Sequence, residues 1–448
     1  MSFFSHYTGT IPIRHLSGKE VLYMQKLHGK KLLLVGFTLF SMFFGAGNLI
    51  FPPHLGAQAG TNFWPAFAGF VLSAIGLPVL AVVAVARTDG LPALAGRVHP
   101  RFAQVFTLLV YLSIGPCLAI PRTASTSFEM FVPLLGSGRQ LQLIYSILFF
   151  AAAFLVALRP EKLTERLGRV LCPTLIFLIV VLFAGCVIHP VAAGYGIPAA
   201  DYAALPAAQG ILDGYQTMDT LAALNFGAVI ALNIQAQGVT ESKAVEQGTI
   251  RAGFLAGGLL LVIYAMLGHL GALTGAAFPG CATGAEVLSA LATSLFGRTG
   301  TVLLAGIFLI ACFNTCVGLI SGVSQYFHTL LPRISYAAIA GFFAAASMLI
   351  SNLGLAGIIR LSTPVLNAIY PVAIVLILLS FLPARFQHRR IYAACIALTA
   401  VQSIRAAIPA TASFANALPL GSLGFGWVIP ALAGLLFGTA ASVRYTRD

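Results

Sequence analysis

Long apolar stretches separated by short polar connections make up most of the chain, and this pattern predicts membrane-spanning helices. A helix needs about 20 apolar residues to cross the ~30 Å hydrocarbon core of a bilayer. Even spacing and short connections predict one integral membrane domain without soluble appendages. The twelve predicted spans run near residues 32–57, 64–87, 103–128, 141–158, 170–189, 206–236, 252–275, 300–327, 334–351, 358–383, 391–409 and 425–442.

The composition supports this reading and excludes other classes of protein. Of the 448 residues, 59% are hydrophobic and only 8% are charged, whereas soluble proteins carry roughly 25% charged residues. Disorder requires low hydrophobicity and high charge, so it is excluded as well. The hydropathy signal is also much stronger than that of an outer-membrane β-barrel. We therefore expect an all-α integral membrane protein.

The net charge of +13 sets the expected orientation. With the N-terminus in the cytoplasm, 20 of the 25 basic residues fall on inward-facing segments and three on outward-facing ones. Basic residues collect in cytoplasmic loops, so this bias places both termini in the cytoplasm. A nucleic-acid partner is not expected.

The first span contains residues that do not suit a simple membrane helix. It reads FTLFSMFFGAGNLIFPP over residues 37–53, with Gly45, Ala46, Gly47 and Asn48 at membrane depth. Glycine weakens a helix and Pro53 removes a backbone donor, so we expect the helix to open here. Open backbone at this depth must line a cavity or be buried in protein. The alternative is that the glycines only allow two helices to pack closely.

The sixth span is also irregular, because it places an acidic residue within the bilayer. It reads GYQTMDTLAALNFGAVIALNIQ over residues 214–235 and carries Asp219 between Met218 and Thr220. Intramembrane acids usually mark an ion or substrate path. The alternative is that Asp213 and Asp219 lie at the outer mouth of the helix and are solvated.

These two interrupted spans open the two halves of a five-plus-five inverted repeat. Corresponding broken helices are the best sequence indication of a transporter binding site. The predicted parts are a cytoplasmic extension (residues 1–30), a ten-helix transport core (31–383) and two additional helices with a short tail (384–448). The two repeats of the core would cover about 31–190 and 206–383.

Two further spans carry weaker signals. In the third, Pro116 and Pro121 predict kinks, while Arg122 and Glu129 lie seven residues apart near the outer end. This pair could form part of an outer gate or reach to the lipid headgroups.

In the eighth span, Cys312, Thr315 and Cys316 share one helix face. A threonine hydroxyl and loosened carbonyls suit a small cation, although such hydroxyls often bond only to the preceding turn.

Three segments resemble the signature segments of bacterial branched-chain amino acid carriers, the LIVCS family. They are FGAGNLIFPP (residues 44–53), GPCLAIPRTASTSFE (115–129) and GYQTMDTLAALNFG (214–227). The resemblance extends over all twelve spans and leaves residues 1–28 outside. It implies the leucine-transporter type of inverted-repeat fold and import of leucine, isoleucine and valine across the bacterial inner membrane, coupled to Na⁺ or, in some members, to H⁺.

The resemblance also implies site residues. The amides around Ala46 and Gly47 would meet the substrate carboxylate, and Asn48 would contribute to one sodium site. Cys316 departs from the pattern, because it replaces a hydroxyl with a thiol, which is a poor Na⁺ ligand. Span six does not align cleanly, so Asp219 is included for its position alone. The expected substrate-binding residues are Gly45, Ala46, Gly47, Asn48, Tyr111, Met218, Asp219 and Thr220. The expected Na⁺ ligands are Ser41, Phe44, Asn48, Cys312, Thr315 and Cys316.

The leading hypothesis is therefore a secondary active symporter with no catalytic residues and no cofactor besides the coupling ion. A H⁺-coupled carrier of the same fold for another small neutral amino acid is the first alternative. A passive channel would need a symmetric ring of charges or carbonyls, which a single chain with two unlike breaks does not offer. The hypothesis of a membrane enzyme rests only on three histidines that lie far apart in the sequence, His189, His269 and His328.

Overall fold

The computed structural model describes residues 27, 29–159, 169–281 and 283–445, and every regular element within these ranges is a helix. The predicted all-α class is therefore confirmed for this part of the chain. The predicted extension, residues 1–30, lies outside the described residues except for positions 27, 29 and 30.

The helices fall into two groups along the chain, separated by the loop before Ala200. The first group contains α2 (Gly29–Phe43), α3 (Ala46–Ala59), α4 (Phe63–Val71), α5 (Leu77–Arg87), α6 (Leu91–Gly96), α7 (Pro100–Leu112), α8 (Ala119–Glu129), α9 (Val132–Leu135), α10 (Arg139–Ala157) and α11 (Cys172–Ile188). The second group contains α12 (Ala200–Ala204), α13 (Pro206–Tyr215), α14 (Asp219–Ala236), α15 (Ser242–Ala277), α16 (Gly284–Leu330), α17 (Tyr336–Ser351), α18 (Gly354–Leu379), α19 (Arg389–Ala407), α20 (Pro409–Asn416) and α21 (Val428–Tyr445).

Seven helical stretches of the described chain are long and apolar enough to cross a bilayer, and the bent pair α13–α14 makes an eighth. One stretch runs continuously from Ala46 to Arg87, and α16 spans 47 residues with a kink at Gly297. Helices α17 and α21 are apolar but shorter. The chain is an integral membrane protein, while the count of twelve spans and the inverted repeat remain predictions.

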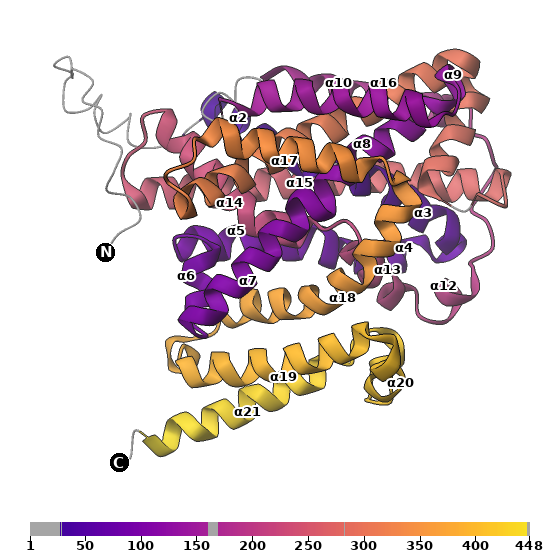
Figure 1. The fold of residues 1–448 in the computed structure, drawn as a ribbon. Coiled ribbons are helices and arrows are strands. Elements are labelled where there is room, and N and C mark those ends of the chain that lie inside the picture. Colours follow the sequence, from indigo (N-terminus) through magenta and orange to yellow (C-terminus); the bar gives the residue numbers. More distant parts are fainter. Residues whose placement is uncertain (1–26, 28, 160–168, 282, 446–448) are drawn as a thin grey trace.

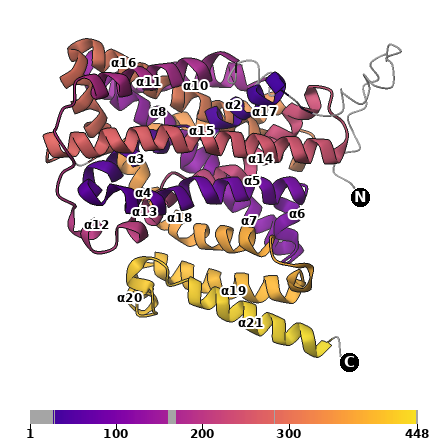
Figure 2. The same ribbon diagram turned by 180° about the vertical axis from the view of Figure 1, so that it is seen from behind.

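The long helices lie side by side, and α19 and α21 form a separate layer beneath α18 (Figures 1 and 2). Helix α19 packs against both α18 and α21. Helices α15 and α16 lie at the centre of the core, where together they contact most of its other helices. The predicted division into a transport core and two additional helices remains a prediction.

Basic residues gather at one end of the bundle. There the end of α5 meets the start of α15, where Arg87 Nε lies 3.9 Å from Glu246 Oε1. The α6–α7 corner meets the start of α19 through Arg97 Nη1, which donates to Gln387 Oε1 at 2.8 Å. Helices α9, α12 and α20 lie at the opposite end (Figure 1). We call the first end the basic end.

The first span opens where glycine was expected, but the prolines do not open it. Helix α2 ends at Phe43 and α3 begins at Ala46, whereas Pro52 and Pro53 lie inside α3. Close packing on α15 holds α3 together despite the two missing donors. A Cβ added to Gly271 of α15 would lie 2.6 Å from the Cα of Pro53. The expectation that Pro53 takes part in opening the helix was therefore wrong.

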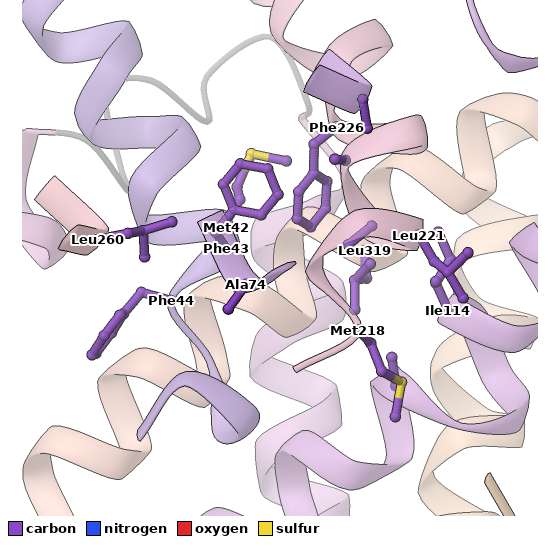
Figure 3. Close-up of a cluster of buried hydrophobic side chains, with 14 of the residues drawn as sticks. Met42, Phe43, Phe44, Ala74, Ile114, Met218, Leu221, Phe226, Leu260 and Leu319 are labelled. Atoms are coloured by element: carbon purple, nitrogen blue, oxygen red, sulfur yellow. The ribbon is translucent and has the colours of Figure 1, made fainter. Parts of the chain in front are cut away.

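A cluster of buried apolar side chains surrounds the breaks (Figure 3). Phe43 at the end of α2 packs edge-to-face on Phe226 of α14, with ring centroids 5.3 Å apart. Ile114, Met218 and Leu221 belong to the same cluster and are each at most 2% exposed. The broken segments are therefore buried in protein and not exposed to lipid.

Candidate substrate and ion site

The break between α2 and α3 exposes the first amides of α3. Gly45 is extended, with φ −124° and ψ −152°, and its N–H donates to Asn48 Oδ1 at 3.1 Å. The first N–H groups of any helix have no partner within the helix and carry partial positive charge. This end of α3 therefore favours an anion, and the contact of Ala46 and Gly47 with a substrate carboxylate remains a prediction.

The break between α13 and α14 lies at residues 216–218, where the two helices meet at a bend of 47°. Met218 adopts the left-handed conformation, with φ 66°, and is buried. A left-handed backbone costs a residue with a side chain roughly 1–2 kcal/mol, so tertiary contacts must hold this segment. The predicted break in the sixth span is confirmed.

The two breaks meet through a buried hydrogen-bonded cluster of Asn48, Asp219 and Tyr264. Asn48 Nδ2 donates to Asp219 Oδ2 and to the hydroxyl of Tyr264. The Tyr264 hydroxyl in turn donates to Asp219 Oδ2 at 3.2 Å. All three side chains are at most 3% exposed. Asp219 is thus buried at the junction, and the alternative of a solvated outer mouth is wrong for this residue.

Arg122 of α8 also reaches this junction. It is only 7% exposed, and its two terminal nitrogens donate to the carbonyls of Gln216 at 3.2 Å and Thr217 at 3.3 Å. Of the two alternatives for Arg122, the one in which it extends to the lipid headgroups is therefore wrong, because carbonyls freed by the second break provide acceptors inside the protein. Glu129 is exposed, at the end of the same helix.

Arg122 and Asp219 lie on either side of one short segment. A Cβ added to Gly47 would lie 2.9 Å from Nη2 of Arg122, while the next residue, Asn48, binds Asp219. Thr217 links the same two groups, because its carbonyl accepts from Arg122 and its hydroxyl accepts from the Asp219 amide at 3.4 Å. Consecutive Cα atoms are only 3.8 Å apart, so a buried cation and a buried acid face one small region.

Gly47 has a second role, since its lack of a side chain also lets α3 approach α8 and the 216–218 segment. A Cβ there would lie 3.1 Å from the Cα of Thr217. The close-packing alternative therefore holds at Gly47, which lies inside α3, while the break itself lies at Phe44 and Gly45.

The predicted cation ligands come from four places: Ser41 from α2, Phe44 from the first break, Asn48 from α3, and Cys312, Thr315 and Cys316 from α16. A Cβ added to Gly45 would lie 2.5 Å from Thr315 Oγ1, which is buried and has no hydrogen-bond partner among the described residues. Ser41 Oγ accepts from Asn314 Nδ2 at 2.5 Å. Thr315 therefore presents an oxygen directly to the gap between α2 and α3.

Two other predicted ligands on α16 offer only sulfur. Cys312 and Cys316 are fully buried, with no exposed surface. Among the residues that the structure describes, the acids, histidines and cysteines form no group of three that could hold a metal ion.

Tyr111 lies apart from the other predicted site residues. Its ring stacks on that of Tyr326, with centroids 4.1 Å apart. Tyr326 is eleven residues beyond Thr315 on α16, which corresponds to about 16 Å of helix rise. The three histidines also remain apart, and His269 is bound to the hydroxyl of Tyr195 at 2.7 Å.

Sequence reasoning missed three residues that the structure brings to the site. Tyr264 completes the buried cluster, Tyr370 accepts from the Thr220 amide at 3.3 Å, and Asn314 binds Ser41. The two tyrosines lie in otherwise apolar helices and show no pattern. Asn314 did carry a signal, as an amide beside Thr315 in a membrane span.

A cavity of about 410 Å³ leads from the surface to the junction. Gly47 and Arg122 line it together with His54, Glu129 and Glu286. Glu129 and Glu286 are both exposed, so the entrance carries acidic groups and the interior a buried guanidinium. This size falls within the range of small-molecule sites.

The family model for branched-chain amino acid transport proteins matches residues 28–444. The branched-chain amino acid permease BraB of Bacillus subtilis (strain 168) is 41% identical over 422 residues, which cover 91% of this chain and 95% of that protein. The branched-chain amino acid transport system 2 carrier protein of Pseudomonas aeruginosa is 42% identical over 359 residues, which cover 80% and 82%.

Solved structures share the fold at low identity. A Na⁺-coupled sialic acid symporter matches with a TM-score of 0.59 at 12% identity, covering 91% of this chain and 88% of that one. Mhp1, a nucleobase-cation-symport-1 family transporter, matches with a TM-score of 0.56 at 13% identity, covering 92% of both chains. These likenesses concern the fold alone. Since the family model and the permeases span most of its length, the chain belongs to the family of branched-chain amino acid transport proteins and is a transporter, not an enzyme.

Proposed function

We propose that this protein is a secondary active symporter that imports leucine, isoleucine and valine together with Na⁺ by alternating access. The observation that carries the proposal is the buried cluster of Asn48, Asp219 and Tyr264, where two broken helices meet. Helix breaks at membrane depth are where transporters of this kind bind substrate and ion. Family membership supports the substrate class.

The substrate carboxylate would bind between the first amides of α3 and Arg122. The amides of Ala46 and Gly47 carry the partial positive charge of a helix N-terminus, and the guanidinium lies beside Gly47. Two of its N–H groups hold the carbonyls of residues 216 and 217. A guanidinium has five donors, so donors remain for an anion that enters from the cavity.

The substrate ammonium would bind at Asp219 and at carbonyls of the second break. Leucine, isoleucine and valine have no polar atom beyond these two groups, so the rest of recognition must be apolar contact. Met218, Leu221 and Ile114 provide apolar surface beside the second break (Figure 3). Arg122 beside Gly47 and Asp219 beside Asn48 offer one positive and one negative group, which complement the two charges of an α-amino acid.

A sodium ion would bind where α2 ends, against α16. Thr315 provides a hydroxyl oxygen that has no hydrogen-bond partner among the described residues. Phe44 lies in the break, next to the last carbonyls of α2, and the last carbonyls of a helix have no partner within it. The Oδ1 of Asn314 is also buried without a partner among the described residues. We expect Cys312 and Cys316 to shape this site and to contribute no ligand, because thiols bind Na⁺ poorly.

The orientation follows from the distribution of charge. We place the basic end and both termini in the cytoplasm, since cytoplasmic loops collect Lys and Arg. The 410 Å³ cavity then faces outward. Its entrance groups Glu129 and Glu286 would attract Na⁺ toward the site.

Uptake of labelled leucine into proteoliposomes tests the proposal. We expect an inward Na⁺ gradient to drive accumulation, and replacement of Na⁺ by choline at fixed pH to abolish it. Accumulation in choline that responds to an imposed pH gradient would instead show H⁺ coupling. Leucine flux that only runs down its own gradient, and that neither the Na⁺ gradient nor the pH gradient drives, would indicate a passive channel.

Coupling to H⁺ is the second candidate, and Asp219 is the observation that favours it. Its buried carboxylate accepts hydrogen bonds from the Asn48 side-chain amide and the Tyr264 hydroxyl. Such a carboxylate could carry a proton through the transport cycle. We favour Na⁺ because Thr315 provides an unused oxygen for a cation and does not titrate.

A further inference from the structure

A second cavity lies at the basic end, far from the substrate site. Its volume is about 300 Å³, and it is enclosed by the end of α5, the α6–α7 corner and the turn that joins α18 to α19. Nothing in the proposed transport mechanism uses it. It is lined by Ala84, Arg87, Thr88, Arg97, Ser380 and Gln387.

Two arginines give this cavity its charge. Arg97 is partly buried, and its Nη1 donates to Gln387 Oε1 at 2.8 Å and to the Tyr392 hydroxyl at 3.1 Å. Its other donors have no hydrogen-bond partner among the described residues. The Arg87 side chain is 55% exposed and lies 3.9 Å from Glu246, which is not among the lining residues. No acidic residue lines the described wall.

The surroundings of the cavity are also basic. Arg389 in the first turn of α19 donates to the carbonyl of Val98 at 3.2 Å, and Arg385 lies in the turn before it. The acidic neighbours are Glu246 and the exposed Asp89. The local balance is therefore positive, at an end of the bundle where predicted spanning helices end.

We propose that this cavity binds the phosphate group of an anionic ligand, with Arg87 and Arg97 as its charged contacts. Arginine matches phosphate well because its planar donors form paired, charge-assisted hydrogen bonds. Basic pockets between helices on the cytoplasmic side suit anionic lipid headgroups. Leu378 and Phe381 beside the cavity are 44% and 36% exposed, and they provide apolar surface for acyl chains. These neighbours favour a phospholipid over a free phosphate.

The bound phosphate would fasten the outer layer to the transport core. Helix α21 packs mainly on α19, and α19 meets the core along α18 and through the bonds from Arg97 to the Tyr392 hydroxyl and from Arg389 to the Val98 carbonyl. A ligand that bridges α5 and the α6–α7 corner to the α18–α19 turn would strengthen this attachment. Phosphate binding should therefore stabilise the protein as well as occupy the cavity.

The test uses the purified full chain and titrates it with phosphatidylglycerol, phosphatidylcholine or inorganic phosphate, read by native mass spectrometry and thermal unfolding. Arg87→Gln removes one contact without breaking the Arg97 hydrogen bonds. Arg101→Gln is the matched control, because it removes an exposed arginine at the same end that does not line the cavity. We expect phosphatidylglycerol to bind better than phosphatidylcholine and to raise the unfolding temperature.

We expect Arg87→Gln to weaken phosphatidylglycerol binding about fivefold, since a basic residue near anionic lipid contributes ~1 kcal/mol, and Arg101→Gln to leave it within twofold. Binding of inorganic phosphate that Arg87→Gln weakens would support the same site with a soluble source. Equal loss in both variants would show only diffuse surface charge and would overturn the proposal. Equal binding of phosphatidylglycerol and phosphatidylcholine, without binding of inorganic phosphate, would also overturn the proposal. Neither result depends on transport activity.

Discussion

The two helix breaks that form the substrate site are built in different ways. The first, between α2 and α3, contains glycine. The Gly45 N–H that this break frees finds a partner three residues away, because it donates to Asn48 Oδ1. The second, between α13 and α14, contains Gln216, Thr217 and a left-handed Met218. Its carbonyls are held by Arg122, 94 and 95 residues away in sequence.

The difference shows two ways to keep open backbone inside a membrane. A glycine break leaves no room for a side chain. A Cβ at Gly45 would collide with Thr315, and one at Gly47 would collide with Arg122. A break without glycine needs partners, because freed carbonyls in a low-dielectric interior are costly when unpaired. The first break should therefore be sensitive to side-chain size and the second to loss of charge.

The largest effect is expected from Gly47→Leu, which tests the first break. The new side chain would meet Arg122 and the Thr217 backbone within ~3 Å, so leucine uptake should fall to background in proteoliposomes while the protein remains folded. The same substitution at Gly258, an exposed position on α15 with no atom within 4 Å of an added Cβ, should leave uptake unchanged. Normal leucine affinity in Gly47→Leu would contradict the proposed carboxylate contact.

Arg122→Gln tests the second break and should raise the KM for leucine by roughly 100-fold, as expected for loss of a charge-assisted contact worth ~3 kcal/mol. The sharper measurement compares leucine with leucine amide, which has no carboxylate. The wild type should strongly prefer leucine, and the variant should lose most of that preference. Unchanged preference with reduced stability would assign Arg122 a purely structural role.

Asp219→Asn is expected to raise the KM for leucine by about 30-fold, because the substrate ammonium loses a charged partner worth ~2 kcal/mol. Dependence on Na⁺ should persist. A carboxylate that carries the coupling proton would behave differently: exchange of internal for external leucine would survive, and gradient-driven uptake would be lost. Measuring both fluxes in one preparation separates the two roles.

The smallest effect is expected from Thr315→Val beside the first break. This change removes one oxygen and nearly keeps the shape, so the Na⁺ concentration for half-maximal uptake should rise about tenfold, or ~1.4 kcal/mol. Leucine affinity at fixed Na⁺ should weaken as well, because coupling between two ligands is reciprocal. An unchanged Na⁺ dependence would place the ion elsewhere.

How far the site could be read from the sequence differs between the two breaks. The segment Gly45–Asn48 was visible because glycine and asparagine are unusual in a membrane helix, and Asp219 was visible as an intramembrane acid. Arg122 was visible too, but the sequence left open whether it turns inward or toward the lipid headgroups. A local pattern does not show whether a long side chain reaches toward lipid headgroups or toward a carbonyl freed in another helix. Tyr264 and Tyr370 gave no signal, since an aromatic residue in an apolar helix usually packs in the core.

The sequence by itself determined the membrane class, the helical fold and the first break, because these follow from hydropathy and from local backbone preference. The second break was indicated by an intramembrane acid, and its backbone is held by tertiary contacts. Only the tertiary structure decided that Pro52 and Pro53 stay helical against α15, and that Tyr111 stacks on Tyr326 away from the site. It also decided which groups meet at the junction of the breaks. Those contacts join residues up to 216 positions apart, and such pairings depend on how whole helices pack, which no local pattern of residues encodes.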